Sequence, residues 1–143
     1  MFLICFGTRP EIIKMYPLIE EFKKNNIPFK TLFTGQHKDL SKQFWNLSGK
    51  PSYSLNGVME HNQSLSQLFS KILSKSDLIF KKGDFKIIVQ GDALSSAAAA
   101  MSAFYNKKDI IHLEAGLRTN NLYSPYPEEA NRVMISHLAN IHF

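Results

Sequence analysis

Residues 2–24, FLICFGTRPEIIKMYPLIEEFKK, change from one hydrophobic pattern to another across a short turn. Phe2–Phe6 is a continuous apolar run of the kind that forms a β-strand. Glu11–Lys24 then carries apolar residues at 12, 15, 16, 19 and 22, the spacing that places side chains on one face of a helix. The stretch therefore predicts a strand that passes through a turn directly into a helix with one apolar face.

The same alternation of strand and helix continues along the chain. Further strands are predicted at Phe29–Phe33, Lys86–Gln90, Ile110–Leu113 and Ile141–Phe143, helices at His37–Leu47, Ser64–Phe80, Leu94–Tyr105 and Glu128–Asn140, and a loop through Gly49, Pro51 and Gly57. This order predicts an α/β fold: a doubly wound, mostly parallel, Rossmann-like sheet with helices on both faces. Because a complete domain rarely ends inside a strand, we expect residues 1–143 to be one incomplete domain, either a truncated gene product or a part of a longer protein.

Composition excludes several classes of protein. The 143 residues carry a net charge of +5, but the lysines are dispersed and form no basic stripe with interleaved aromatics, so we expect no nucleic-acid partner. No apolar stretch has the length of a membrane span, and the first apolar run is too short for a signal peptide. The single cysteine, Cys5, excludes an internal disulfide and a zinc site built on several cysteines, and we expect it in the core. These features predict a cytoplasmic protein with no membrane partner.

The segments that follow the strands carry the candidate functional residues, because ligands of such sheets bind at the carboxyl ends of the strands. After the first strand, Thr8 and Glu11 have the spacing of a capping box, and Pro10 suits the first turn of a helix. Helix initiation explains these three residues, but it does not explain Arg9. The strand is followed neither by a GxGxxG motif nor by a cluster of metal ligands, so we predict neither NAD nor a metal ion.

Three acidic residues follow later strands or open the last helix: Asp92, Glu114 and Glu128. The predicted topology places them at one edge of the sheet, beside Arg9. Crowded carboxylates raise one another's pKa, so that one can donate a proton and another can accept it, as proton transfer at carbon requires. Taken singly, Asp92 can be a helix N-cap, and Glu128 with Glu129 suits the positive end of a helix dipole.

Five strings occur in order along the chain: FGTRPEIIK (6–14), TGQH (34–37), QGD (90–92), HLEAGLRT (112–119) and YSPYPEEANR (123–132). With these strings the chain resembles the UDP-N-acetylglucosamine 2-epimerase family, in its non-hydrolysing branch. The resemblance implies the N-terminal domain of a two-domain GT-B fold, with the C-terminal nucleotide-binding domain absent here. It also implies reversible conversion of UDP-GlcNAc to UDP-ManNAc without a cofactor, by elimination of UDP to 2-acetamidoglucal and its re-addition.

The resemblance also assigns roles to residues. Asp92, Glu114 and Glu128 match the acid and base carboxylates of the family, without fixing which one removes the proton and which returns it. Arg9 matches an arginine that holds the nucleotide diphosphate, where a guanidinium donates two hydrogen bonds to phosphate oxygens. Arg132 is expected to anchor the PEE segment by pairing with an acid.

Two more segments of the resemblance bear on the site. Gln36 and His37 match a segment at which some bacterial members bind a second UDP-GlcNAc as an activator. Ala93 stands where the family usually has threonine, which removes a hydroxyl able to cap the next helix. We expect Asp92 or Ser95 to compensate for this loss.

Two alternatives to the non-hydrolysing epimerase stay open. A hydrolysing epimerase of the same fold would release UDP and ManNAc. A truncated, non-catalytic sugar-nucleotide binding module would fit a chain that ends at Phe143. Full-length family members are implied to be homodimers, and we expect the isolated residues 1–143 to be inactive.

Overall fold

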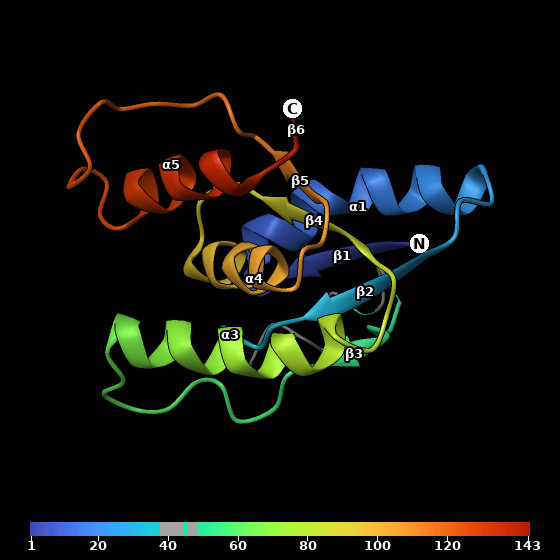
Figure 1. Cartoon of the computed structure of the whole chain (residues 1–143), viewed down its shortest axis with the longest axis horizontal. Coiled ribbons are helices and arrows are strands. Elements are labelled where there is room, and N and C mark those ends of the chain that lie inside the picture. The colour runs from blue at the N-terminus through green and yellow to red at the C-terminus, as the bar shows by residue number, and fades with distance from the viewer. Residues whose placement is uncertain (38–44, 46–48) are drawn as a thin grey trace.

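The computed structural model describes residues 1–37, 45 and 49–143 and contains a parallel sheet with helices on both faces (Figure 1). The elements are β1 Phe2–Phe6, α1 Arg9–Lys24, β2 Phe29–Phe33, β3 Tyr53–Ser54, α3 Leu65–Phe80, β4 Lys86–Gln90, α4 Leu94–Tyr105, β5 Ile110–Leu113, α5 Glu128–Leu138 and β6 Ile141–His142. The six strands lie in the order β3-β2-β1-β4-β5-β6, and every neighbouring pair is parallel. The predicted α/β fold class is confirmed.

Alternate residues along each strand enter two separate hydrophobic cores. Leu3 and Cys5 of β1 pack with residues of α3, α4 and α5 on one face. Ile4 and Phe6 pack with the apolar stripe of α1 on the other face. This division follows from the two-residue period of a strand, whose successive side chains point to opposite faces. In Figure 1, α3, α4 and α5 accordingly lie next to one another.

Helix α4 is the central helix of its layer because its side chains are small. Ala97–Ala100 are fully buried, and the helix contacts both α3 and α5. An alanine surface allows helices and sheet to approach closely, which fixes α4 tightly over β4. The residues that immediately precede α4 are therefore held by a rigid support.

Three local predictions need correction or fall outside the described part. The predicted loop through Gly49, Pro51 and Gly57 contains the two-residue strand β3, which is too short to produce a periodic pattern. The last helix ends at Leu138, two residues before the predicted end at Asn140. The predicted helix His37–Leu47 lies for the most part outside the described residues.

The strand order creates a crevice between β1 and β4. The chain leaves β1 toward α1 on one face and leaves β4 toward α4 on the other, so the two loops diverge at the carboxyl end of the sheet. Gly7 lets three segments meet there, since a Cβ at this position would lie 2.0 Å from Thr34 Oγ1 and 2.9 Å from Ser95 Cβ. Glycine is thus required by close approach, and the turn after β1 lies directly against the start of α4.

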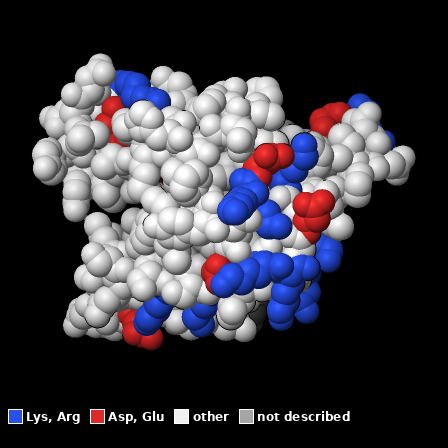
Figure 2. Space-filling view, viewed as in Figure 1, with Lys and Arg blue, Asp and Glu red and all other residues white. Residues whose placement is uncertain are grey.

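Basic residues gather at the opposite end of the strands. Lys86 begins β4 and pairs with Asp109, which precedes β5, while Lys81 pairs with Asp77 at the end of α3. Figure 2 shows lysine and arginine side chains on this side of the visible face with acids interspersed.

In the described ranges, no helix is both long enough and apolar enough to span a membrane.

Candidate functional site

A cavity of about 380 Å³ opens at the carboxyl ends of β1, β2 and β4. Its walls come from the turns after these strands, from α1 and from the starts of α3, α4 and α5. They consist of Thr8, Pro10, Glu11, Lys14, Gln36, His37, Leu65, Gln90, Asp92, Ala93, Leu94, Pro127, Glu128 and Asn131. This volume suits a small ligand such as a sugar ring with part of its substituents. The cavity lies at the point where strand order reverses, which is where ligands of doubly wound sheets bind.

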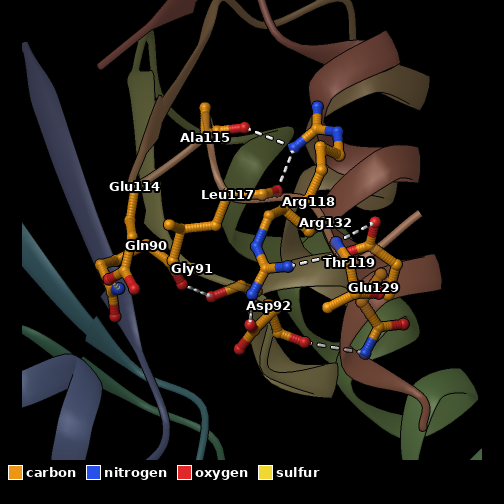
Figure 3. Close-up of polar contacts among 12 residues, drawn as sticks. Gln90, Gly91, Asp92, Glu114, Ala115, Leu117, Arg118, Thr119, Glu129 and Arg132 are labelled. Atoms are coloured by element: carbon orange, nitrogen blue, oxygen red, sulfur yellow. Dashed lines mark hydrogen bonds and ion pairs between the residues drawn. The ribbon is translucent and has the colours of Figure 1, made fainter. Parts of the chain in front are cut away.

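Asp92 lies in this wall, held by the start of α5. Its carboxylate pairs with the Arg132 guanidinium, which also donates to Glu129 Oε2 at 2.8 Å (Figure 3). The backbone carbonyl of Asp92 accepts a 2.9 Å hydrogen bond from Asn131 Nδ2. Arg132 is 5% exposed, so its contact with Glu129 is buried, while the contacts of Asp92 with Arg132 and Asn131 are half-buried. The expectation that Arg132 anchors the PEE segment is confirmed, and the same guanidinium also positions Asp92.

The two adjacent glutamates of PEE have opposite surroundings. Glu129 is 1% exposed, and its Oε1 accepts hydrogen bonds from the backbone N–H groups of Thr119 at 2.9 Å and Asn120 at 3.2 Å. Glu128 instead lines the cavity, and its Oε2 is buried without a hydrogen-bond partner among the described residues. A buried carboxylate oxygen without a partner is costly unless a ligand or water satisfies it. Glu128 is therefore the acid of this pair that is available for chemistry.

Glu114 follows β5 in a left-handed backbone conformation, with φ of 60°. This conformation is unfavourable for a residue with a side chain and is enriched at functional sites. Its Oε2 accepts from Lys14 Nζ at 2.5 Å and from Gln90 Nε2, and both donors line the cavity. Lys14 was missed as a site residue, because the helical pattern of α1 marks it only as a polar position away from the apolar stripe.

The three predicted acids are thus brought to one edge of the sheet. Asp92 and Glu128 line one cavity, and Glu114 is bonded to two residues of its wall. The expected crowding of carboxylates against one another needs correction, since Asp92 contacts Arg132 and Glu114 contacts Lys14. A cation paired with Asp92 and another paired with Glu114 reduce the repulsion among carboxylates that gather at this edge.

The other predicted site residues divide into two groups. Gln36 and His37 line the cavity, and the backbone N–H of His37 donates to the Gly7 carbonyl at 2.9 Å. Arg9 is the first residue of α1 and has an exposed side chain that is not part of the cavity wall. Its contact with a nucleotide diphosphate stays a prediction.

The expectation that Asp92 or Ser95 caps α4 is wrong. Ala93, not Asp92, is the N-cap residue, and neither its own side chain nor that of Asp92 or Ser95 caps the helix. The backbone N–H of Ser95 donates instead to Gln36 Oε1 at 2.9 Å. This contact joins segments 59 residues apart, so no local sequence signal could have predicted it.

Glu11 has a larger role than the predicted capping box. Its carboxylate accepts the backbone N–H of Thr8 at 2.7 Å, as the motif predicts, and in addition that of Gly7 at 2.9 Å. It also accepts the hydroxyl of Ser96 at 2.5 Å and that of Ser95 at 3.1 Å. The turn after β1 is therefore bonded to the first turn of α4, which joins two walls of the cavity.

His112 holds the turn that carries Asp92 in place through a hydrogen bond. It is fully buried in β5, and its Nε2 lies 2.8 Å from the Gly91 carbonyl, which fixes Nε2–H as the donor. Burial lowers the pKa of His112 from its usual 6.5, the hydrogen bond to Gly91 opposes this, and Coulombic interactions with His142, Arg118 and Arg132 lower it further. His112 is therefore a neutral histidine with a structural role.

The lowered pKa makes folding stability sensitive to acid. As the pH falls through 6.5, the unfolded chain binds the proton at His112 before the folded chain does, so stability present above this pH is lost. We expect His112→Gln, which keeps a donor for the Gly91 carbonyl but does not titrate, to lose less stability between about pH 7 and about pH 5. Urea unfolding at both pH values measures this difference. The exposed His137→Gln serves as control, and equal losses in the wild type and His112→Gln would contradict the assignment.

The described residues contain no group of three His, Cys, Asp or Glu side chains arranged to hold a metal ion. The Cys5 thiol is buried in the core, and burial raises its pKa far above the usual value. It is therefore a packing residue and not a nucleophile.

The sheet, its switch-point cavity and the acids in the cavity wall define a ligand-binding α/β protein of the Rossmann-like class. The sequence profile described as UDP-N-acetylglucosamine 2-epimerase matches residues 20–143. The chain belongs to the UDP-N-acetylglucosamine 2-epimerase family.

Individual relatives agree in sequence and in structure. A UDP-N-acetylglucosamine 2-epimerase of Campylobacter jejuni is 46% identical over 146 residues, which cover 99% of this chain and 37% of that protein. The crystal structure of the UDP-GlcNAc 2-epimerase from Neisseria meningitidis bound to UDP-GlcNAc superposes with a TM-score of 0.91 at 44% identity, over 99% of this chain and 39% of that one. The crystal structure of the Methanocaldococcus jannaschii UDP-GlcNAc 2-epimerase in complex with UDP-GlcNAc and UDP superposes with a TM-score of 0.85 at 35% identity, over 97% of this chain and 39% of that one. This chain therefore spans less than half of each relative.

Proposed function

We propose that this chain supplies the acid–base half of a UDP-N-acetylglucosamine 2-epimerase, which interconverts UDP-GlcNAc and UDP-ManNAc. The observation that carries the proposal is the cavity whose wall contains Asp92 and Glu128, with Glu114 bonded to Lys14 and Gln90 beside it. Carboxylates at several positions around one small cavity can reach a sugar carbon from more than one side. Inversion at that carbon needs this arrangement, because a proton leaves one face and another returns to the opposite face.

The proposed reaction proceeds by elimination and re-addition. One carboxylate removes the proton from C2 while the C1–O bond breaks, and the bonding electrons leave with UDP to give 2-acetamidoglucal. A second acid delivers a proton to the opposite face of C2, and UDP adds back at C1. Arg9 is proposed to bind the diphosphate, where a guanidinium stabilises the charge that develops on the leaving group. Gln36 and His37 are proposed to contact a second UDP-GlcNAc.

Residues 1–143 are proposed to be the N-terminal domain of a two-domain GT-B fold in a cytoplasmic homodimer. Support comes from the relatives, of which this chain covers 37% to 40%. In this arrangement the second domain closes over the cavity and completes the nucleotide site. The whole reaction therefore needs residues that this chain does not contain.

A chimera tests the proposal directly. We expect residues 1–143 alone to turn over no UDP-GlcNAc, and a chimera in which they replace the matching segment of the Campylobacter jejuni relative to form UDP-ManNAc. In D₂O the product should carry deuterium at C2, because the returning proton comes from solvent-exchanged acids. Turnover by residues 1–143 alone would contradict the two-domain proposal. Release of free ManNAc by the chimera would identify a hydrolysing enzyme, and inactivity of a folded chimera would favour a binding module.

A further inference from the structure

The N-terminus of α4 faces the cavity but has no cap of its own. Ala93 is its N-cap residue, with extended backbone angles of −60° and 150° that suit a capping side chain, yet alanine has no oxygen to offer. Ala93 and Leu94 both line the cavity. The first backbone N–H groups of a helix have no partner within the helix and need one from elsewhere when they are buried.

Gln36 supplies this partner from a different segment. Its Oε1 accepts the backbone N–H of Ser95, the second residue of α4, at 2.9 Å. Ser95 is 1% exposed, so water does not replace the contact easily. Gln36 follows β2 and is itself half-buried in the cavity wall. The amide oxygen of Gln36 thus caps the N-terminus of α4, the role that a side chain at position 93 would ordinarily have.

The position of α4's first turn bears on Asp92, which directly precedes the N-cap residue Ala93. Asp92 is held by Arg132 and Asn131 on the side of α5, while Gln36 holds the helix start on the side of β2. We propose that Gln36 is a positioning residue, which caps α4 and thereby fixes the turn that carries Asp92 in the cavity wall. The inference rests on the proposed function, because the role of Asp92 in turnover belongs to it.

The test compares Gln36→Ala with the double variant Gln36→Ala/Ala93→Thr. Threonine at an N-cap offers a hydroxyl to the N–H groups of the second or third helical residue, so it should restore the cap from within the segment. Gln63→Ala is the matched control, because the Gln63 amide also accepts a backbone N–H, that of Glu60 at 3.0 Å, but lies outside the cavity wall. Amide hydrogen exchange at Ser95 is measured in residues 1–143, and kcat and KM are measured in the chimera.

We expect Gln36→Ala to speed exchange at Ser95 by about fivefold, the factor that corresponds to a typical N-cap. It should also lower kcat about tenfold with little change in KM, since a displaced acid impairs the chemical step more than binding. The double variant should recover both quantities, and Gln63→Ala should alter neither.

Unchanged exchange at Ser95, or failure of Ala93→Thr to restore it, would overturn the capping role. Faster exchange with an unchanged kcat would overturn the positioning role. If the chimera with the unaltered chain forms no UDP-ManNAc, the proposed function fails, while exchange at Ser95 still decides whether Gln36 caps α4.

Discussion

Replacing Arg132 by methionine is expected to lower the free energy of unfolding by about 3–5 kcal/mol, the usual cost of removing one partner from a buried ion pair. The guanidinium is 6% exposed and bridges Asp92 and Glu129, whose carboxylates lie on two different segments. Methionine fills a similar volume but leaves the buried Glu129 carboxylate without a cation. The loss is a large share of the stability of an ordinary domain. Urea unfolding of residues 1–143 measures it.

Arg118→Met is the matched control for this prediction. Arg118 lies nearby and donates to the Ala115 and Leu117 carbonyls at 2.6 Å each (Figure 3), but it forms no ion pair with a carboxylate of the described residues. Its removal leaves no buried charge without a partner, so we expect the free energy of unfolding to fall by about 1 kcal/mol or less. If Arg132→Met costs no more than Arg118→Met, the bridge does not hold the PEE segment and Asp92 together.

The sequence predicts most of the fold because its elements follow from local patterns. The apolar run Phe2–Phe6 and the strand Lys86–Gln90, with its apolar centre, form central parallel strands, and the spacing of apolar residues in α1 and α3 matches their buried faces. β3 has only two residues, Tyr53–Ser54, and pairs with the end of β2. It was missed because such a short strand exists through its tertiary contacts and has no period of its own.

The candidate site, like the fold, could be predicted from the sequence only in part. Asp92, Glu114 and Glu128 could be placed together from sequence because parallel strands deliver their carboxyl ends to one edge. The partners of these acids could not be predicted. Lys14 reaches Glu114 across 100 residues, and Gln36 reaches the start of α4 across 59. Such contacts depend on side-chain direction in the folded state, which hydrophobic periodicity does not encode.

Replacing Glu128 by glutamine is expected to lower kcat of the chimera by about 10²–10⁴-fold, the range for loss of a general acid or base. Glutamine keeps the shape of the side chain but cannot exchange a proton with C2. Glu128 Oε2 has no internal partner among the described residues, so the change breaks no hydrogen bond of that oxygen. The free energy of unfolding should therefore stay within about 0.5 kcal/mol of the wild type. Deuterium incorporation at C2 in D₂O should fall in parallel with turnover.

For Glu129→Gln, at the neighbouring position, we expect the opposite result: a loss of stability with a much smaller effect on turnover. Glu129 accepts two backbone N–H groups through Oε1 and the Arg132 guanidinium through Oε2, all away from the cavity wall. Removing its charge weakens charge-assisted, buried hydrogen bonds, so we expect a loss of about 1.5–3 kcal/mol in stability. Because Glu129 does not face the cavity, kcat of the folded variant should fall much less than in Glu128→Gln. A reversal, with turnover lost in a stable Glu129→Gln and kept in Glu128→Gln, would mean that the second acid of PEE and not the first carries the proton.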